Sequence, residues 1–348
     1  MRIGIIGHFG GNENFTDGQT IKTKMLYEAL KNQIESIQTI EIVDTYYAKR
    51  SPVKFFAKVF LCIIRNKKIV VLLSKSGRKV LFPLLYWSTK LLKREIYHDA
   101  IGGQLANEAV SSNRWKKYIS SFQSNWVESK QMVEQLHSLG VENARFIPNF
   151  KQIKIVDVKD LPQEFSEPIC FCTFSRVMRE KGITDAIRAI IDVNHDEGKM
   201  KVALDIYGPV EVGYKREFQE MLDASKGSCS YKGIVSPSCS VDVLKNYYAL
   251  LFPTYWKGEG MPGTVIDALS AGLPIIARRW EFSDEMLYHH DNALLYDKDR
   301  PEELKCWINY SINHFDEMRK MRLRCLKYAQ FYSSDHIITD ILEQMGLN

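Results

Sequence analysis

The sequence LLFPTYWKGEGMPGTVIDALSAGLPIIAR at residues 250–278 predicts the fold class of this chain. Apolar runs at 250–253 and 274–277 predict two buried strands. The residues from Thr264 predict a short helix between them, with Gly272 just beyond its end. A strand, a helix and a second strand in this order form one unit of a parallel sheet. Because ligands bind beyond the carboxyl ends of parallel strands, the turn before the helix is a predicted binding site.

Two carboxylates and the start of the helix surround this turn. The unpaired N–H groups that open a helix favour an anion, so Gly263 and Thr264 are predicted to hold a phosphate. Glu259 lies in the turn, and Asp267 lies one turn into the helix. Both side chains accept hydrogen bonds and suit the hydroxyl groups of a sugar. From the residues alone, an exposed helix carboxylate is an equally weighted interpretation of Asp267.

This segment resembles the glutamate-x7-glutamate signature of the retaining glycosyltransferases of family 4. Its GEGMPG form looks like the bacterial branch that builds capsule, exopolysaccharide or O-antigen. The resemblance implies an α/β protein with the GT-B fold, in which two Rossmann-like domains face each other across a cleft and a C-terminal helix crosses back to the first domain. It also implies that Glu259 holds the donor sugar and that Asp267 holds the ribose. Asp267 departs from the signature, because aspartate is one methylene shorter than glutamate.

A second pair of charged residues follows the strand predicted at 169–175. Arg176 and Lys181 lie after this strand and before a helix, where the two cations can neutralise a diphosphate. The family carries an arginine and a lysine at this spacing, so the resemblance implies the same role. Exposed loop charges are the alternative interpretation, and we prefer it for Arg179 and Glu180.

Further predicted site residues follow other strands. The resemblance implies that Gly208 lies at the rim of the donor site, and that the backbone of Gly233 and Ile234 meets the nucleobase. The helix that begins at Gly18 is predicted to approach the donor phosphate. The resemblance also implies that His98 reaches the donor sugar or the acceptor, although a lone histidine in a turn is more often structural.

The length of 348 residues predicts two domains. Strands and helices alternate in both halves, so both sheets should be parallel. We predict that residues 1–160, completed by a C-terminal helix at 335–348, bind the acceptor. Residues 161–334 are predicted to bind the nucleotide sugar, and the charged segment 151–167 is the predicted linker.

The composition, 45% hydrophobic and 26% charged, is that of a globular protein, and no run reaches the roughly 20 apolar residues of a membrane helix. The amino end predicts a strand and a turn rather than a signal peptide, so we expect a cytoplasmic location. Seven cysteines without paired CxxC spacing argue against a disulfide framework or a zinc module. The string at 289–291 lacks the spacing of metal ligands on one helix face. The DxD string at 297–299 follows a predicted strand and precedes a helix, which indicates a turn and a helix cap. We therefore expect neither a metal nor another cofactor.

The formal charge of +5 is concentrated in residues 46–95, which hold thirteen Lys or Arg and a single acid, Glu95. Within them, residues 51–68 predict an amphipathic helix with a basic edge, a type that binds anionic bilayers. A helix packed on the sheet with a solvated basic rim is an equally weighted interpretation. Because no nucleic-acid-binding motif accompanies the basic residues, we expect no nucleic-acid partner.

With the resemblance, these features predict a retaining, metal-independent glycosyltransferase of hexosyl or N-acetylhexosaminyl type. Its donor would be a nucleotide sugar, and UDP is the nucleotide that family frequency favours. The implied acceptor is a saccharide carried on a polyprenyl diphosphate, which places the enzyme at the inner face of the cell membrane. A nucleotide-sugar epimerase of the same fold, a noncatalytic partner subunit of another transferase and a membrane-surface binding module are the alternatives.

Overall fold

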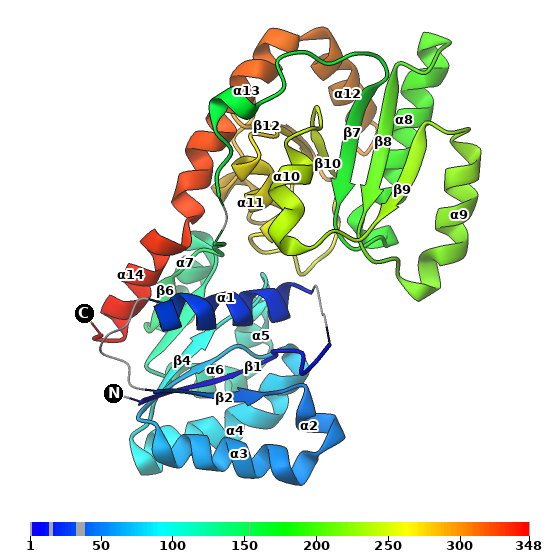
Figure 1. The fold of residues 1–348 in the computed structure, drawn as a ribbon. Coiled ribbons are helices and arrows are strands. Elements are labelled where there is room, and N and C mark those ends of the chain that lie inside the picture. Colours follow the sequence, from blue (N-terminus) through cyan, green and yellow to red (C-terminus); the bar gives the residue numbers. More distant parts are fainter. Residues whose placement is uncertain (1, 14–16, 33–38, 153, 348) are drawn as a thin grey trace. The chain divides into compact units, whose positions relative to one another are not determined.

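The chain forms two compact units (Figure 1). Unit 1 comprises Met1–Gln152 and Tyr332–Asn348, and unit 2 comprises Ile153–Phe331. The computed structural model describes residues 2–13, 17–32, 39–152 and 154–347. None of the helices within these ranges has the length and apolar character needed to cross a bilayer.

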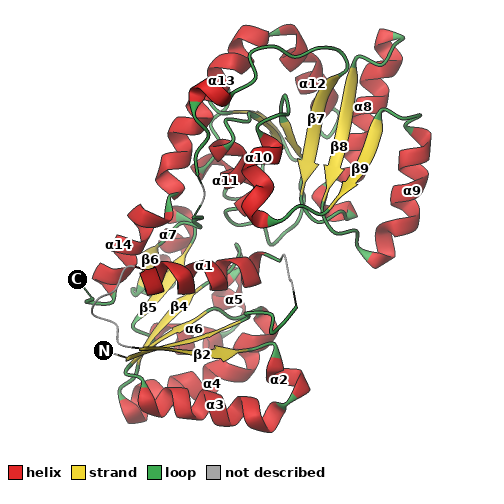
Figure 2. Cartoon of the chain, in the orientation of Figure 1, coloured by secondary structure: helices red, strands yellow, loops and turns green. Residues whose placement is uncertain are grey.

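Unit 1 is built on a parallel sheet with the strand order β2-β1-β3-β4-β5-β6. Its strands are β1 (Arg2–Gly7), β2 (Thr39–Asp44), β3 (Lys68–Val71), β4 (Glu95–Asp99), β5 (Ser124–Val127) and β6 (Ala144–Phe146). Its helices are α1 (Gly18–Asn32), α2 (Tyr47–Arg50), α3 (Pro52–Arg65), α4 (Lys75–Leu92), α5 (Leu105–Ser111), α6 (Asn113–Ser120), α7 (Lys130–Ser138) and α14 (Ser334–Gln344). Helices cover both faces of this sheet, and α3 and α4 lie on the face away from α1 (Figure 2).

The C-terminal helix α14 packs on unit 1. Ile3 of β1, Leu26 of α1 and Ile341 of α14 are fully buried in one hydrophobic cluster. Trp126 Nε1 of β5 donates a hydrogen bond to Gln344 Oε1 at 2.7 Å. The predicted return of the last helix to the first domain is therefore confirmed, and burial of its apolar face against the sheet explains it.

Unit 2 has a second parallel sheet, with the strand order β12-β11-β10-β7-β8-β9. Its strands are β7 (Ile169–Phe174), β8 (Val202–Tyr207), β9 (Cys229–Gly233), β10 (Leu250–Phe252), β11 (Ile275–Arg278) and β12 (Ala293–Tyr296). Its helices are α8 (Ile183–Glu197), α9 (Lys215–Ala224), α10 (Ser240–Leu244), α11 (Gly263–Ser270), α12 (Glu303–Asn313) and α13 (Phe315–Ala329). Ile187 of α8, Leu204 of β8 and Ile308 of α12 are fully buried in the core that this sheet forms with its helices.

The predicted strands are all present in the part of the chain that the structure describes, and both sheets are parallel as expected. Helix α5, Leu105–Ser111, follows Gly102 and Gly103 closely. Leu105, Ala106 and Ala109 are buried, so a short apolar stripe stabilises this helix despite the two glycines that precede it.

Candidate active site

The carboxyl edge of the unit 2 sheet gathers most of the predicted site residues. Strands β7 and β10 are neighbours in this sheet and run parallel. The loop after β7 carries Arg176 and Lys181, and the loop after β10 carries Glu259. Because both loops leave the same edge, residues 78 positions apart in the sequence come into contact.

Lys181 and Glu259 form a buried ion pair. Lys181 Nζ lies 2.5 Å from Glu259 Oε2, and the two side chains are only 10% and 8% exposed. Thr254 Oγ1 donates a second hydrogen bond to the same carboxylate oxygen at 2.8 Å. The backbone also joins the two loops, because Tyr255 N donates to Glu180 O at 2.9 Å. The site therefore holds a carboxylate and an ammonium group in one fixed, charge-assisted contact.

Arg176 is exposed and contacts the loop that carries Glu259. Its guanidinium carbon lies 5.2 Å from the centre of the Trp256 ring. Among the described residues, no hydrogen bond or ion pair is formed by the Arg176 side chain. By contrast, Arg179 on the following turn forms an exposed ion pair with Glu217. The N–H donors of Arg176 are thus open to an anion, as a diphosphate-binding role requires.

Asp267 and the start of α11 complete this side of the site. Asp267 is 3% exposed, so its interpretation as an exposed helix carboxylate is wrong. The helix begins at Gly263, and Thr264 Oγ1 donates to Phe174 O at the end of β7 at 2.7 Å. This hydrogen bond fixes the start of the helix against the Arg176 loop. Because the Thr264 hydroxyl donates to Phe174 O, the backbone N–H of Thr264 is the donor that remains for a phosphate.

The predicted nucleobase segment lies at the same edge of the sheet. Gly208 follows β8 and Gly233 ends the neighbouring strand β9. Gly208 N donates to Gly233 O at 2.8 Å, so the two turns are joined through their backbones. Ile234 follows and is 58% exposed. The structure thus brings these three residues together, and their contact with a nucleobase stays a prediction.

His98 has a different environment from the one its predicted role requires. It lies within β4 and has no exposed surface, with its ring against Phe82 and Phe122. Its Nδ1 lies 3.1 Å from Asn125 Oδ1, which is an acceptor. Burial lowers the pKa of His98 to about 3. These contacts favour the structural interpretation of His98 over the catalytic one.

Gly18 begins α1, as predicted. Asp17 directly before it accepts hydrogen bonds from Thr20 N at 3.1 Å and from Thr20 Oγ1 at 2.7 Å. A carboxylate at this position takes up an N–H group that a phosphate would need and adds a like charge. The predicted phosphate contact at Gly18 therefore gains no support from the geometry.

Unit 1 also contains a buried charge cluster that the sequence did not predict. Lys22 Nζ of α1 lies 2.7 Å from Asp99 Oδ1 and 2.9 Å from Glu128 Oε1. All three side chains are at most 5% exposed, and burial raises the pKa of Asp99. The only signal in the sequence was a lysine on the side of α1 that carries Leu26 and Leu30. We assign this cluster a structural role, since it joins α1 to the ends of β4 and β5.

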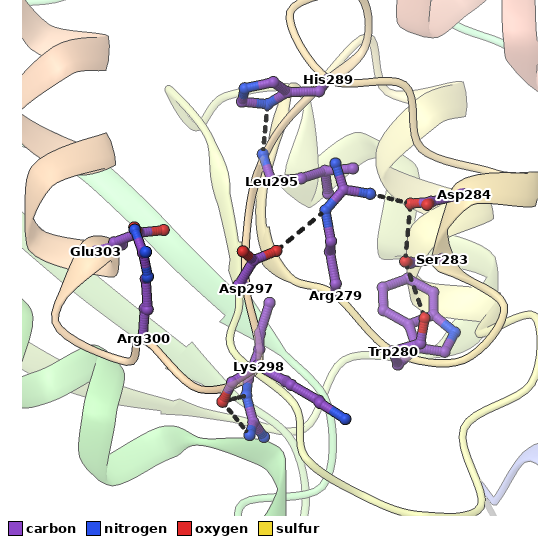
Figure 3. Close-up of polar contacts among 11 residues, drawn as sticks. Arg279, Trp280, Ser283, Asp284, His289, Leu295, Asp297, Lys298, Arg300 and Glu303 are labelled. Atoms are coloured by element: carbon purple, nitrogen blue, oxygen red, sulfur yellow. Dashed lines mark hydrogen bonds and ion pairs between the residues drawn. The ribbon is translucent and has the colours of Figure 1, made fainter.

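The acidic string at 297–299 follows β12. Figure 3 shows Arg279 between Asp284 and Asp297, and Arg279 Nε lies 3.7 Å from Asp297 Oδ1. The backbone of Asp297 also accepts a hydrogen bond from Arg300 N at 3.1 Å. The backbone of Asp297 is therefore part of a turn, and its carboxylate forms an ion pair with Arg279. Nowhere in the described ranges do three His, Cys, Asp or Glu side chains form a group suited to a metal ion.

Comparison with known proteins gives a family match for part of this chain. Residues 168–312 match the family model described as Glycosyl transferases group 1. An uncharacterised glycosyltransferase of Methanocaldococcus jannaschii is 24% identical over 214 residues, which are 60% of this chain and 51% of that protein. The chain thus spans about half the length of this curated relative.

Solved structures resemble the whole chain. HepE of Anabaena, in complex with UDP and glucose, has a TM-score of 0.73 at 14% identity, with 99% of both chains covered. Sucrose-phosphate synthase of Thermosynechococcus elongatus has a TM-score of 0.74 at 15% identity, with 99% of this chain and 98% of that chain covered. The fold is GT-B. The lipopolysaccharide outer core galactosyltransferase WaaB gives the same GT-B match, with a TM-score of 0.70 at 15% identity and 99% of both chains covered.

The buried His98 of this GT-B protein predicts a pH dependence with a definite sign. Its pKa is about 3 when folded and 6.5 ordinarily, so the unfolded chain binds more protons between these values. The stability that this group contributes is complete above pH 6.5 and is lost as the pH falls toward 3, by up to about 1.4 kcal/mol per pH unit.

We expect the variant His98→Leu to lose this part of the pH dependence. The measurement is urea unfolding at pH 7.5 and pH 5.5. His195, whose side chain is 88% exposed, provides the control variant His195→Leu. Equal pH dependence in wild type and His98→Leu would contradict the buried, neutral state of His98.

Proposed function

We propose that this protein is a glycosyltransferase that transfers a sugar from a nucleotide sugar to a saccharide acceptor. The observation that carries the proposal is the Lys181–Glu259 ion pair, which lies beside the open Arg176 at the carboxyl edge of a GT-B sheet. The match of residues 168–312 to the group 1 glycosyl transferases supports it. HepE, a structural neighbour, binds UDP-glucose, which favours UDP as the nucleotide here.

We propose a metal-independent mechanism with retention of the anomeric configuration, as in family 4. Arg176 and Lys181 stabilise the negative charge that develops on the departing diphosphate. Glu259 accepts hydrogen bonds from hydroxyl groups of the donor sugar and holds Lys181 in place, and Asp267 binds the ribose. The leaving phosphate takes the proton of the attacking acceptor hydroxyl, so that no protein nucleophile is needed. Positioning and fixed charges supply most of the rate enhancement.

A panel of nucleotide sugars tests this proposal. The purified protein is incubated with each donor in the presence of a metal chelator, with and without a bacterial lipid extract, and the released nucleoside diphosphate is measured. Release that requires one donor and the lipid extract is the expected result. Donor conversion without an acceptor would instead indicate an epimerase. Nucleotide binding without release under any condition would indicate a noncatalytic partner subunit.

We further propose that the acceptor is carried on a membrane lipid, as in the building of a bacterial surface polysaccharide, and that unit 1 binds it. The outer face formed by α3 and α4 supports this proposal. Helix α3 buries Phe55, Val59, Cys62 and Ile63 against the sheet, so the packed-helix interpretation holds for one side of it. Its other side exposes Phe56, Phe60 and Ile64, by 42%, 56% and 47%.

Helix α4 extends this apolar surface. Val80, Trp87 and Leu91 are 55%, 56% and 73% exposed. Neither α3 nor α4 contains an Asp or Glu, whereas exposed lysines occur on both, among them Lys54 and Lys90. A surface that combines large apolar side chains with uncompensated positive charges is the type that binds an anionic bilayer. We propose that this face holds the enzyme at the inner face of the cell membrane.

Vesicle co-sedimentation tests this face. The double variant Lys54→Ala/Lys58→Ala should bind vesicles that contain anionic lipid roughly tenfold to thirtyfold more weakly than wild type, because each basic residue contributes about 1 kcal/mol. Phe56→Ser/Phe60→Ser should also weaken binding. Phe331→Ser is the matched control, because Phe331 is 59% exposed in unit 2. Equal binding of all variants, or no preference for anionic over neutral vesicles, would contradict the proposal.

A further inference from the structure

Trp256 lies in the loop between β10 and α11, and the proposed mechanism gives it no role. The residue is 38% exposed although tryptophan is a large apolar side chain. The guanidinium carbon of Arg176 lies over the Trp256 ring, 5.2 Å from the ring centre. An exposed tryptophan next to a group of charged site residues indicates a purpose other than core packing.

Arg176 and Arg278 both lie over aromatic rings, of Trp256 and Tyr255, but the N–H donors of Arg278 are used within the protein. Arg278 donates to Lys298 O from Nε at 3.0 Å, and Arg279 forms ion pairs with two aspartates. Arg176 forms no comparable side-chain contact within the described ranges. The ring of Trp256 attracts the guanidinium through its face while leaving every N–H donor free. This geometry orients a cation without neutralising it.

The backbone of Trp256 belongs to the same turn as the buried ion pair. Trp256 N donates to Thr254 Oγ1 at 3.3 Å, and that hydroxyl donates to Glu259 Oε2. Glu259 N in turn donates to Trp256 O at 3.1 Å. The position of the indole is thus coupled to the position of the Glu259 carboxylate. The two cations of the site therefore contact the same turn, Arg176 through Trp256 and Lys181 through Glu259.

Gly258 provides the space that the indole occupies. A Cβ atom at this position would lie 2.7 Å from Trp256 Nε1 and 3.4 Å from its Cε2. An alanine here would therefore displace the ring, because the clash involves the far end of a side chain and not the backbone. The sequence Trp-Lys-Gly-Glu is consistent with a turn built around this ring.

We propose that Trp256 is a positioning residue that holds the Arg176 guanidinium ready for the diphosphate of the donor. The inference rests on the proposed function. It gives Trp256 a role in binding the diphosphate group and none in binding the nucleoside. Loss of the indole should weaken binding of a nucleoside diphosphate but not of the corresponding nucleoside. A tryptophan that only stabilises the loop would affect both ligands equally.

Isothermal titration calorimetry with UDP and with uridine tests the proposal. We expect Trp256→Leu to raise the Kd for UDP about twofold to fivefold, the range that an exposed cation–π contact supports, and to leave the Kd for uridine unchanged. Trp256→Phe retains an aromatic face and should recover part of the affinity. Gly258→Ala, which displaces the ring without removing it, should weaken UDP binding in the same direction as Trp256→Leu.

The variant Arg176→Ala shows whether Trp256 acts through Arg176. In that background, Trp256→Leu should cause no additional loss of UDP affinity. Equal weakening of UDP and uridine by Trp256→Leu, or additive losses in the double variant, would overturn the inference while the proposed function stands. A wild-type protein that binds neither UDP nor any other nucleoside diphosphate would overturn the proposed function and this inference together.

Discussion

Replacing Lys181 with alanine or Glu259 with glutamine should lower the rate of sugar transfer about 10²- to 10³-fold, the effect of removing one fixed charge from a transition-state site. Each change also leaves one buried charge without its partner, because the two side chains are only 10% and 8% exposed. We therefore expect each single variant to be less stable by up to about 3–5 kcal/mol. Transfer rates and urea unfolding measure the two effects separately.

The double variant Lys181→Gln/Glu259→Gln separates catalysis from stability. It removes both charges, so it should be more stable than either single variant and yet equally inactive. Arg179→Ala is the matched control, because Arg179 lies on the same turn but forms an exposed ion pair with Glu217. We expect that variant to keep nearly full activity. Recovery of transfer in the double variant would show that the pair serves stability and not catalysis.

Replacing Gly182 with alanine should have the second largest effect. Gly182 has φ +71°, and a Cβ atom there would lie 2.2 Å from Pro253 O. This close approach holds the turn that carries Lys181 against the end of β10. The substitution combines left-handed strain, about 1–2 kcal/mol, with overpacking against backbone, about 1–3 kcal/mol. We expect a loss of about 2–5 kcal/mol in the free energy of unfolding and a strong loss of transfer.

Gly198 offers a matched control for this substitution. It has φ +65° at the end of α8, but a Cβ atom there would meet no atom within 4 Å. Gly198→Ala should therefore show the left-handed strain alone, with normal transfer. The difference between the two variants, measured by urea unfolding, isolates the contact with Pro253. Equal stability of both variants would contradict the argument that this contact holds the site together.

The fold could be predicted from the sequence because its signals are local. Apolar runs of four to six residues separated by helical segments indicate a parallel sheet, and the residues from Glu259 to Asp267 combine a turn with the start of a helix. The burial of Asp267 agrees with a function for that carboxylate and not with an exposed position. These features depend on residues that are close together in the sequence, so the residue pattern predicts them.

The contacts that complete the site are not local. Lys181 and Glu259 are 78 residues apart, and only the adjacency of β7 and β10 brings them together. Arg176 meets Trp256 for the same reason. His98 shows the opposite case, since a histidine beside a glycine turn suggested a reactive group and packing among aromatic rings buries it. Sequence patterns indicate which residues follow a strand but not which strands are neighbours.

Helix α3 shows a third limit of prediction from the sequence. Its apolar residues occur on two sides, so the sequence supported both packing on the sheet and binding to a bilayer. The structure uses Phe55 and Val59 for packing and leaves Phe56 and Phe60 exposed. The two interpretations thus describe different sides of one helix, and the exposed side carries the proposal of membrane contact.

Sugar transfer itself is the most direct test of the proposed function. A bacterial lipid extract is incubated with the protein and the nucleotide sugar that it consumes, and mass spectrometry then measures the saccharide lipids. We expect a lipid-linked product heavier by one sugar residue, formed in the presence of a chelator and absent with Glu259→Gln. A donor that is consumed without any such product, or a product formed equally well by Glu259→Gln, would contradict it.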